Sequence, residues 1–146
     1  MNIYNSNFEK LVDFHGTHSS SLQVMKSIFS DFCALENCKF GIEGKEEKDG
    51  ASFAYTTFLN FITFRDSEFF YGLNLSHSNF TQSPNFSNSK INEANTNRET
   101  FRIIKHAHDS IGNSLEANES FVLEMKKYKE ELKKKMIPNK RKLNNK

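Results

Sequence analysis

The sequence predicts a mainly β fold with some α-helix, in which a short solenoid of stacked coils is followed by an antiparallel pair of helices. Two observations predict it. Between Ala51 and Asn97 a large apolar residue returns about every fifth position, and after Asn97 the apolar spacing becomes helical. A repeat of five matches neither the period of a strand nor that of an amphipathic helix. A fixed short repeat is instead typical of a solenoid, whose units bury their apolar faces by stacking on each other.

A five-residue unit fits a square coil in which each unit forms one side and its large central residue points to the axis. The residue two positions earlier shares that inward face, and it is small in most units, as at Ala51, Thr56 and Ser67. The chain has 15 phenylalanines and no tryptophan, and phenylalanine suits a dry axis because it adds bulk without a polar atom. The predicted axial residues are Leu35, Phe40, Phe53, Phe58, Phe64, Phe69, Leu75, Phe80, Phe86 and Ile91.

The units ASFAY, TTFLN, SEFFY, SNFTQ and SKINE resemble those of the pentapeptide-repeat family. This resemblance implies a right-handed quadrilateral β-helix, and it implies no catalytic residues. Two steps depart from the pattern, because they are six residues long instead of five. They run from Phe58 to Phe64 and from Phe80 to Phe86, and Pro84 falls within the second. We expect bulges or irregular corners at these two steps.

Residues 1–32 are predicted to form an irregular or helical N-terminal cap. The unit SNFEK around Phe8 resembles a degenerate repeat, whereas the segment 19–32 has apolar residues at helical spacing after a run of serines suited to an N-cap. A cap is expected because an uncovered terminal coil offers unpaired backbone groups to another chain. The residues at helical spacing are Leu22, Met25, Ile28, Phe29 and Phe32.

The repeats are predicted over residues 33–97, with Cys33 and Cys38 each at the small inward position of its unit. The segment 43–50, EGKEEKDG, breaks the pattern with charges between glycines and is predicted to be a solvent-exposed loop. The two cysteines lie on adjacent sides of a square coil and do not face a common point. We interpret them as apolar fillers rather than as metal ligands or a disulfide.

A helical hairpin is predicted over residues 98–136, and residues 137–146 are predicted to be a disordered basic tail. The segments Thr96–Glu99 and Asn113–Glu116 both fit a capping box. Gly112 is expected to end the first helix in a left-handed conformation, and Pro138 to end the second. The first helix carries a stripe of Phe101, Ile104, His108 and Ile111. The second carries a stripe of Leu115, Phe121 or Val122, Met125, Tyr128 and Leu132.

Charge is divided unevenly along the chain. Residues 126–146 hold ten basic and two acidic residues, whereas the preceding part holds ten basic and sixteen acidic residues. Three interpretations stay open for the basic end: a solvated helix terminus, contact with an anionic membrane surface, or nucleic-acid binding. Nucleic acid is disfavoured because aromatic side chains are nearly absent from this segment. The residues expected at an anionic surface are Lys126, Lys127, Lys133, Lys134, Lys135, Lys140, Arg141 and Lys142.

The residue patterns indicate neither an enzyme nor a cofactor or metal site. No serine-hydrolase, phosphate-loop or zinc-protease motif occurs in the sequence. His106 and His108 point to different faces of a helix, so they cannot hold one ion together. His15 and His18 have a spacing compatible with a metal on a helix, but no carboxylate pattern accompanies them.

Three functional hypotheses follow. The first is a non-catalytic scaffold or interaction module, with an unidentified protein partner or a homodimer through the C-terminal helices. The second is a membrane-associated regulatory domain. The run NRETFRIIKHAHDSIGNSLEANESFVLEMKKYKEEL resembles a segment that often precedes membrane spans in bacterial pentapeptide-repeat proteins, so the chain would be a truncated or soluble version. The third, a DNA mimic that binds type II topoisomerases, is disfavoured by the short acidic stack. The expected location is the cytoplasm, with a peripheral position at the inner membrane as the alternative.

Overall fold

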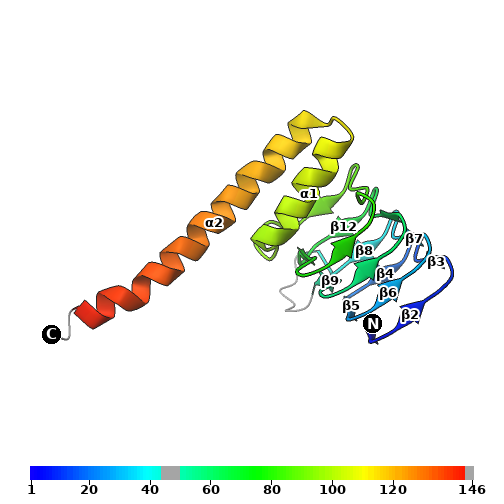
Figure 1. The fold of residues 1–146 in the computed structure, drawn as a ribbon, viewed down its shortest axis with the longest axis horizontal. Helices are drawn as coiled ribbons and strands as arrows, with labels where there is room; N and C mark the ends of the chain where they lie inside the picture. The colour runs from blue at the N-terminus through cyan, green and yellow to red at the C-terminus, as the bar shows by residue number, and fades with distance from the viewer. Residues whose placement is uncertain (44–49, 144–146) are drawn as a thin grey trace.

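The computed structural model describes residues 1–43 and 50–143, with side chains to residue 137, as a stack of coils followed by two helices (Figure 1). The first coil consists of β1 (Asn2–Tyr4), β2 (Asn7–Phe8), β3 (Val12–Asp13) and β4 (His18–Ser19). The second consists of β5 (Leu22–Met25), β6 (Ile28–Phe29), β7 (Cys33–Ala34) and β8 (Lys39–Phe40). The third consists of β9 (Ala51–Ser52), β10 (Thr57–Phe58), β11 (Ile62–Thr63) and β12 (Glu68–Phe69). The fourth consists of β13 (Leu73–Asn74), β14 (Asn79–Phe80) and β15 (Lys90–Ile91).

The strands pair between successive coils and form four parallel sheets. Sheet A has the order β1-β5-β9-β13, sheet B the order β2-β6-β10-β14, sheet C the order β3-β7-β11, and sheet D the order β4-β8-β12-β15. A bridge between Thr63 and Asn85 continues sheet C into the fourth coil. The chain therefore visits the four sheets in the same order in each coil, which is a solenoid-like repeat as predicted.

Aromatic rings stack along the inside of sheet B. Phe8 pairs in register with Phe29, Phe29 with Phe58, and Phe58 with Phe80. Their ring centroids are 4.7, 5.1 and 5.2 Å apart in that order, with nearly parallel planes. This spacing follows from the ladder itself, because neighbouring parallel strands lie about 4.8 Å apart and identical inward positions fall on top of each other. Sheet pairing and core packing are thus set by the same repeat.

The predicted axial residues lie on the inside of the stack to different depths. Phe80 and Ile91, both in the fourth coil, are half-buried. The others are at most 3% exposed, namely Leu35, Phe40, Phe53, Phe58, Phe64, Phe69, Leu75 and Phe86. The axial residues of the second and third coils are therefore all fully buried, whereas in the fourth coil this holds for Leu75 and Phe86 but not for Phe80 and Ile91.

The prediction of a helix over residues 19–32 was wrong, because this segment contains β5 and β6, which pair with strands on both sides. Residues 1–32 do not form a separate cap, because they supply the first coil and part of the second. The apolar spacing was ambiguous: Leu22 and Phe29 are buried, but Met25 and Ile28 are about 40% exposed. Inward residues in fact follow the same beat as downstream, with Val24 and Phe29 five positions apart.

The six-residue steps are a regular feature and not local irregularities. They also occur from Phe8 to Phe14 and from Phe29 to Leu35, so the extra residue falls between sheets B and C in every coil. At this corner the rings of Phe32 and Phe61 stack at 5.9 Å between centroids. Because the extra residue lies at the same place in each coil, the coils stay in register. The bulges expected at two isolated positions are therefore one longer corner, repeated between sheets B and C.

Corners that follow sheets A and C contain a residue in the left-handed conformation, two positions after the inward residue. These residues are Asn5, Gly16, Lys26, Asn37, Tyr55, Asp66, His77 and Asn88, with φ between 50° and 69°. Glycine, asparagine and aspartate adopt this conformation most readily. Lys26, Tyr55 and His77 therefore occupy strained positions that the stacked neighbours impose.

The segment predicted as the loop 43–50 joins the second coil to the third, and residues 44–49 lie outside the described residues. Ala51 pairs with Leu22 on one side and with Leu73 on the other. The repeat therefore resumes in register after the connection.

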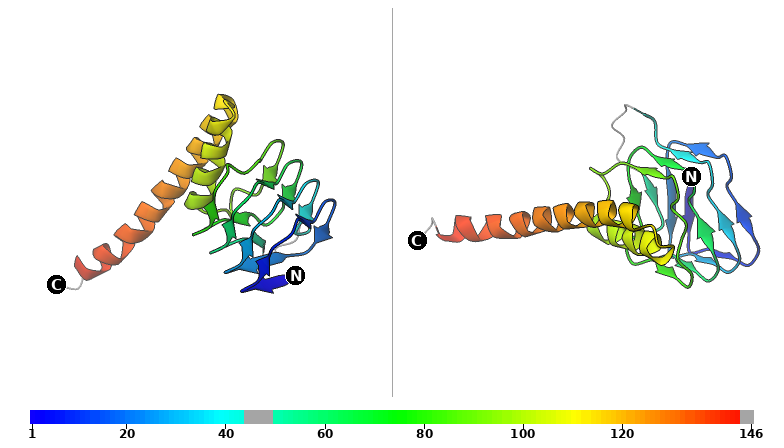
Figure 2. Two further views of the ribbon diagram at one scale, coloured as in Figure 1. Left: turned by 45° about the vertical axis from the view of Figure 1, so that its right-hand side comes forward. Right: turned by 90° about the horizontal axis from the view of Figure 1, so that it is seen from above.

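Helix α1 (Arg98–Ser110) covers the last coil (Figures 1 and 2). Its N-cap is Asn97, whose side chain accepts from the Thr100 amide. The predicted capping box at Thr96–Glu99 was wrong, because the Glu99 carboxylate accepts a hydrogen bond from the His77 amide instead of turning back. Thr96 is used by the coil as well, since its hydroxyl oxygen accepts from the Leu73 amide.

Helix α2 (Ser114–Leu143) follows after a short turn in which Gly112 has a φ of 73°, as predicted. Asn113 caps it by accepting from the Glu116 amide. The prediction that Pro138 ends this helix was wrong, because the helical backbone continues to Leu143, inside the predicted disordered tail. Proline removes one backbone hydrogen bond and costs about 3 kcal/mol in a helix, which weakens a long helix without forbidding it.

Candidate interaction surface on the C-terminal helix

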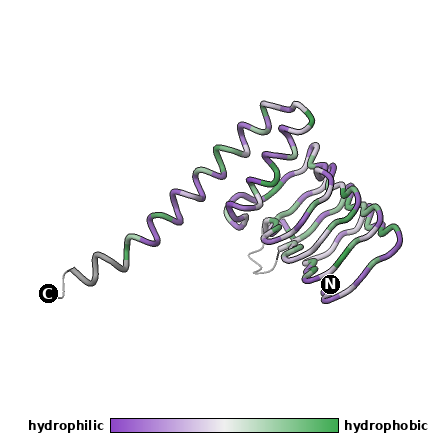
Figure 3. Tube along the Cα trace, viewed as in Figure 1, coloured by the Kyte–Doolittle hydropathy of each residue, from purple (hydrophilic) through white to green (hydrophobic). Residues whose placement is uncertain are grey.

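The apolar side chains of α2 lie mostly on a face directed away from α1. Val122 is 64% and Met136 63% exposed, and apolar positions recur along the helix into its projecting part (Figure 3). We call this exposed set the α2 stripe and define it as Phe121, Val122, Met125, Tyr128, Leu132 and Met136. Large exposed apolar residues gathered on one helix face indicate an interaction surface, whereas scattered ones do not.

The opposite face of α2 packs mainly through small and polar residues, and Leu123 is partly buried against the core beside them. Ala117 and Ser120 are buried, and their size lets the two helices approach closely. The buried carboxylate of Glu124 accepts from the Arg102 guanidinium at 2.9 Å. A buried glutamate with a charged partner is held by that pair, because removing the partner would leave an uncompensated charge. The orientation of α2 is therefore set by this face and not by its most apolar residues.

Two contacts near the ends of the helix pair show that it is antiparallel. His108 Nε2 lies 3.3 Å from the Glu116 carboxylate, close to the connecting turn. At the other end Arg98 lies 3.4 Å from the Glu131 carboxylate. The first residue of α1 therefore reaches only as far as Glu131, and the remainder of α2 extends past α1, away from the coils (Figure 1).

Cations from α1 lie over the two aromatic rings of the stripe. The Arg98 guanidinium is 4.8 Å from the centroid of the Tyr128 ring, and the Lys105 ammonium is 5.8 Å from that of Phe121. Both distances fit a cation–π interaction. These rings form the edge of the stripe nearest to α1, and they are the part of it that the protein itself partly covers.

The lysines predicted for an anionic surface separate into two groups. Lys126 donates to the Glu93 carboxylate, which lowers the pKa of Glu93, and Lys127 donates to the Ala94 carbonyl at 3.1 Å. These two lysines thus hold α2 to the end of the stack. Lys133, Lys134 and Lys135 are exposed on the projecting part. Lys140, Arg141 and Lys142 lie where the structure describes the backbone alone.

A pocket of about 300 Å³ lies between the turn at residues 94–97 and α2. Four of its five lining charges are paired, Arg98 with Glu131 and Lys127 with Glu130, and the fifth belongs to the exposed Lys134. A pocket whose net charge comes from one exposed lysine offers little to hold a ligand. We therefore interpret it as part of the contact between α2 and the stack.

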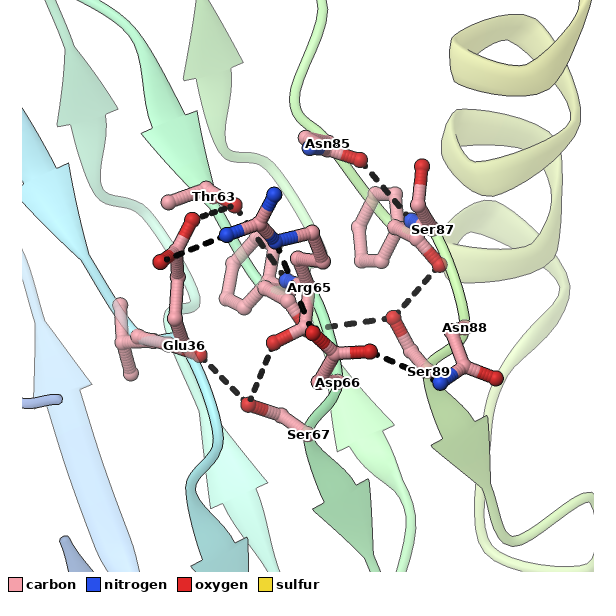
Figure 4. Close-up of polar contacts among 12 residues, drawn as sticks. Glu36, Thr63, Arg65, Asp66, Ser67, Asn85, Ser87, Asn88 and Ser89 are labelled. Carbon is pink, nitrogen blue, oxygen red and sulfur yellow. Dashed lines mark hydrogen bonds and ion pairs between the residues drawn. The ribbon is translucent and has the colours of Figure 1, made fainter. Parts of the chain in front are cut away.

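The polar side of the stack at sheet C and its following corner is also internally satisfied (Figure 4). Glu36 accepts from the Thr63 hydroxyl at 3.2 Å and from Arg65 at 3.3 Å. The Asn88 amide donates to Asp66 at 2.7 Å. Each of these bonds joins successive coils, so the side chains stabilise the stack as a ladder.

The two cysteines are buried, free thiols. Burial raises the pKa of Cys33 to about 12, and it raises the pKa of Cys38 as well. The Cys38 thiol donates to the Phe14 carbonyl of the neighbouring coil at 3.0 Å. A thiol is a nucleophile only as a thiolate, so these groups serve as fillers of the inward position.

Within residues 1–43 and 50–143, no group of three or more histidine, cysteine, aspartate or glutamate side chains is placed to hold a metal ion. His108 is buried and His106 is exposed, so the two diverge. The described helices also include none that is long and apolar enough to cross a membrane.

No family model matches the chain, and comparisons with curated proteins and with solved structures found no match. The sequence indicated that α2 has an apolar stripe, but not which way the stripe faces. That direction depends on the buried contacts of Ala117, Ser120 and Glu124, which no helical periodicity marks as a packing face.

Proposed function

We propose that this chain is a non-catalytic interaction module of the pentapeptide-repeat type. The coils act as a compact support, α1 joins that support to α2, and the α2 stripe is the binding surface. The finer assignment to a right-handed quadrilateral β-helix is supported by the four sides and by inward residues five or six positions apart. The interaction role is supported by one observation above all, the exposure of the α2 stripe.

Two physical arguments favour this role over a purely structural one. An apolar helix face left in water is costly, at about 25 cal/mol for each Å² of apolar surface that could be buried. Most large apolar side chains of α2 also stay outside the contact with α1, where alanine, serine and a buried glutamate pack together with Leu123. Keeping the larger side chains outside is the arrangement expected when a partner covers them.

The test is to compare the proteins retained by tagged wild-type chain and by a stripe variant in cells of its own source. In the variant, Val122→Glu and Leu132→Glu place charges on the stripe without touching the α1 contact. We expect at least one partner to be retained about tenfold less by this variant, since a buried unpaired charge costs several kcal/mol at an interface.

The matched control carries Leu11→Glu and Leu59→Glu, because both residues are about half-exposed on the coils and far from α2 along the chain. It should retain the same partner as the wild type. If wild type, stripe variant and control retain the same proteins in the same amounts, the proposed function is contradicted.

A second candidate, association with an anionic membrane surface, is favoured by the lysines that accompany the stripe. Lys129 and Lys133 lie beside Leu132 and Met136 on the helix surface, as in helices that lie in a membrane interface. Flotation with vesicles of anionic lipid tests it. Binding that is lost in the stripe variant and weakened by salt supports the membrane, and equal flotation of both proteins contradicts it.

A further inference from the structure

The projecting part of α2 has little support from its own chain. The helix has 30 residues, which corresponds to about 45 Å. Its polar contacts with α1 and the stack extend from Glu116 to Glu131, so about twelve residues continue beyond them (Figure 2). A helical segment of that length is marginal in water by itself. Something that packs along the projecting part would stabilise it.

The stripe has the spacing that pairs two helices. Val122, Met125, Leu132 and Met136 fall on one line, and Lys129 occupies the position between Met125 and Leu132. Alternating steps of three and four residues form the seam of a helix pair, and one polar residue in such a seam selects register and orientation. The stripe lies on a different face from Ala117, Ser120 and Glu124, so α1 touches only its edge, at Phe121 and Tyr128.

Charge along α2 is segregated between its two halves. Residues 114–125 contain three glutamates and no basic residue, whereas residues 126–137 contain six lysines and two glutamates. If two copies paired in parallel, the lysine-rich halves would lie side by side and repel. Glu116 and Glu124 contact His108 and Arg102 of α1, so the exposed carboxylate of this half is that of Glu119, and an antiparallel pair places it beside the lysine-rich half of the other helix. The chain is therefore complementary to itself in one orientation.

We infer that the partner of the α2 stripe is a second copy of this chain, with the two α2 helices antiparallel around a two-fold axis near Met125 and Tyr128. This inference rests on the proposed function and names the partner of the same surface. The projecting part of each helix then lies along the part of the other that its own α1 supports. Glu119 of each copy comes near Lys133 of the other, and the interface is isologous, as two-fold symmetry requires.

The first measurement is the molar mass of the purified chain by light scattering across a concentration series. The wild type should approach twice the chain mass of 16.9 kDa. The variant with Val122→Glu and Leu132→Glu should be monomeric over the same range, with dimer affinity at least about tenfold lower. The control with Leu11→Glu and Leu59→Glu should remain dimeric. Circular dichroism and urea unfolding of all three proteins check that the coils remain folded.

Orientation is tested with two single-cysteine additions, Asn118→Cys and Met136→Cys, under mild oxidation. The native thiols are buried and serve as an internal blank. In the antiparallel pair neither variant crosslinks efficiently to itself, but a mixture of the two gives a covalent heterodimer. A parallel pair would give the reverse result, with each variant crosslinked to itself, and that result would overturn the inference.

Salt dependence gives an independent check of the charge argument. Raising the salt concentration from about 0.05 to about 0.5 M should weaken the antiparallel dimer several-fold, because it screens the attraction between the halves. Glu119→Lys should weaken it further at low salt, and adding Lys133→Glu in the same chain should restore it. A dimer that salt strengthens contradicts this arrangement.

The outcomes separate this inference from the proposed function. A wild-type chain that is monomeric at about 200 µM, a concentration that would populate even a weak dimer, overturns the second-copy inference. If that monomer floats with anionic vesicles and the stripe variant does not, the membrane is the occupant and the stripe remains the functional surface. A dimer that survives the stripe substitutions also overturns the inference, because its interface lies elsewhere.

Discussion

The two ends of the coil stack differ in how their last strands are completed. At the C-terminal end, α1 lies across the fourth coil and buries Phe101 and Ile104 against it. At the N-terminal end, β1, β2, β3 and β4 are each the terminal strand of their sheet. Inward residues of that first coil, such as Ile3 and Phe8, are only half-buried. The C-terminal end of the stack is therefore covered by a helix, whereas the N-terminal end leaves one edge of each terminal strand unpaired within the described residues.

The covered end shows how the outer backbone amides of the last coil are satisfied. The outward amide of Leu75 donates to the Thr100 hydroxyl at 2.9 Å, and that of Leu73 donates to the Thr96 hydroxyl at 3.2 Å. Side-chain oxygens thus take the place of the carbonyls that a fifth coil would supply. A helix can cap parallel strands when it supplies both an apolar face and acceptors at the strand spacing, since buried unpaired amides are costly.

Replacing the same stacked ring in the middle and at the open end should show the largest difference. Phe58→Ala should lower the free energy of unfolding by about 3–5 kcal/mol, because the ring is fully buried between two others. Phe8→Ala should cost only about 1–2 kcal/mol, because its ring has a neighbour on one side. Urea unfolding followed by circular dichroism measures both. Equal losses would show that depth in the stack does not set the contribution.

Two glycines with positive φ, one at each end of the stack, sharpen the comparison. Gly72 at the covered end has a φ of 87°, and an added Cβ would lie 2.6 Å from the Asn95 carbonyl oxygen. Gly16 in the first coil has a φ of 69° and open space around it. Gly72→Ala should therefore cost about 3 kcal/mol, combining strain with a backbone clash. Gly16→Ala should cost about 1 kcal/mol of strain alone.

Thermal and urea midpoints of the two alanine variants measure this difference. If Gly16→Ala lowers stability as much as Gly72→Ala, the first coil is packed more tightly around Gly16 than its open surroundings indicate.

Removing one capping hydroxyl tests whether α1 completes the ladder. Thr100→Val keeps the shape of the side chain but leaves the Leu75 amide without its acceptor, and it should cost about 1–2 kcal/mol. Hydrogen exchange at the Leu75 amide should also become faster. Thr17→Val in the first coil is the control and should change stability by about 0.5 kcal/mol or less. Unchanged exchange at Leu75 would argue against the capping role.

The smallest effect is expected at a corner near the open end. Lys26 has a φ of 51° in a position where the corresponding corner residue of the first coil is Asn5. Lys26→Asn should raise stability by about 0.5 kcal/mol, because asparagine tolerates the left-handed conformation better. The reverse change at an equivalent corner, Asn37→Lys, should lower it by a similar amount. Urea midpoints of the two variants that move in the same direction would contradict this account of the corners.

Much of the solenoid could be predicted from spacing because its inward residues repeat with the chain. The beat from Phe53 to Phe86 is visible in the sequence because most of its residues are aromatic. In the first two coils some of the same inward positions hold smaller residues, namely Ile3, Val24 and Ser19. Exposed apolar residues such as Met25 and Ile28 therefore hid the five-residue spacing and imitated a helical one. The six-residue step became recognisable as regular only when the sheets showed that every coil has it on the same side.

The candidate site was predicted less well, for a physical reason. By itself the sequence determined that the repeats stack, that two helices follow with a short turn, and that α2 carries apolar residues on one side and lysines toward its end. These are local properties, set by side chains within a few positions of each other. Only the tertiary structure decided that Ala117, Ser120 and Glu124 pack on α1 while Val122, Met125 and Leu132 face outward. That choice depends on Arg102 and on the last coil, which lie far from α2 along the chain. Glu124 is buried because Arg102 pairs with it, and the periodicity of α2 alone does not reveal this pairing.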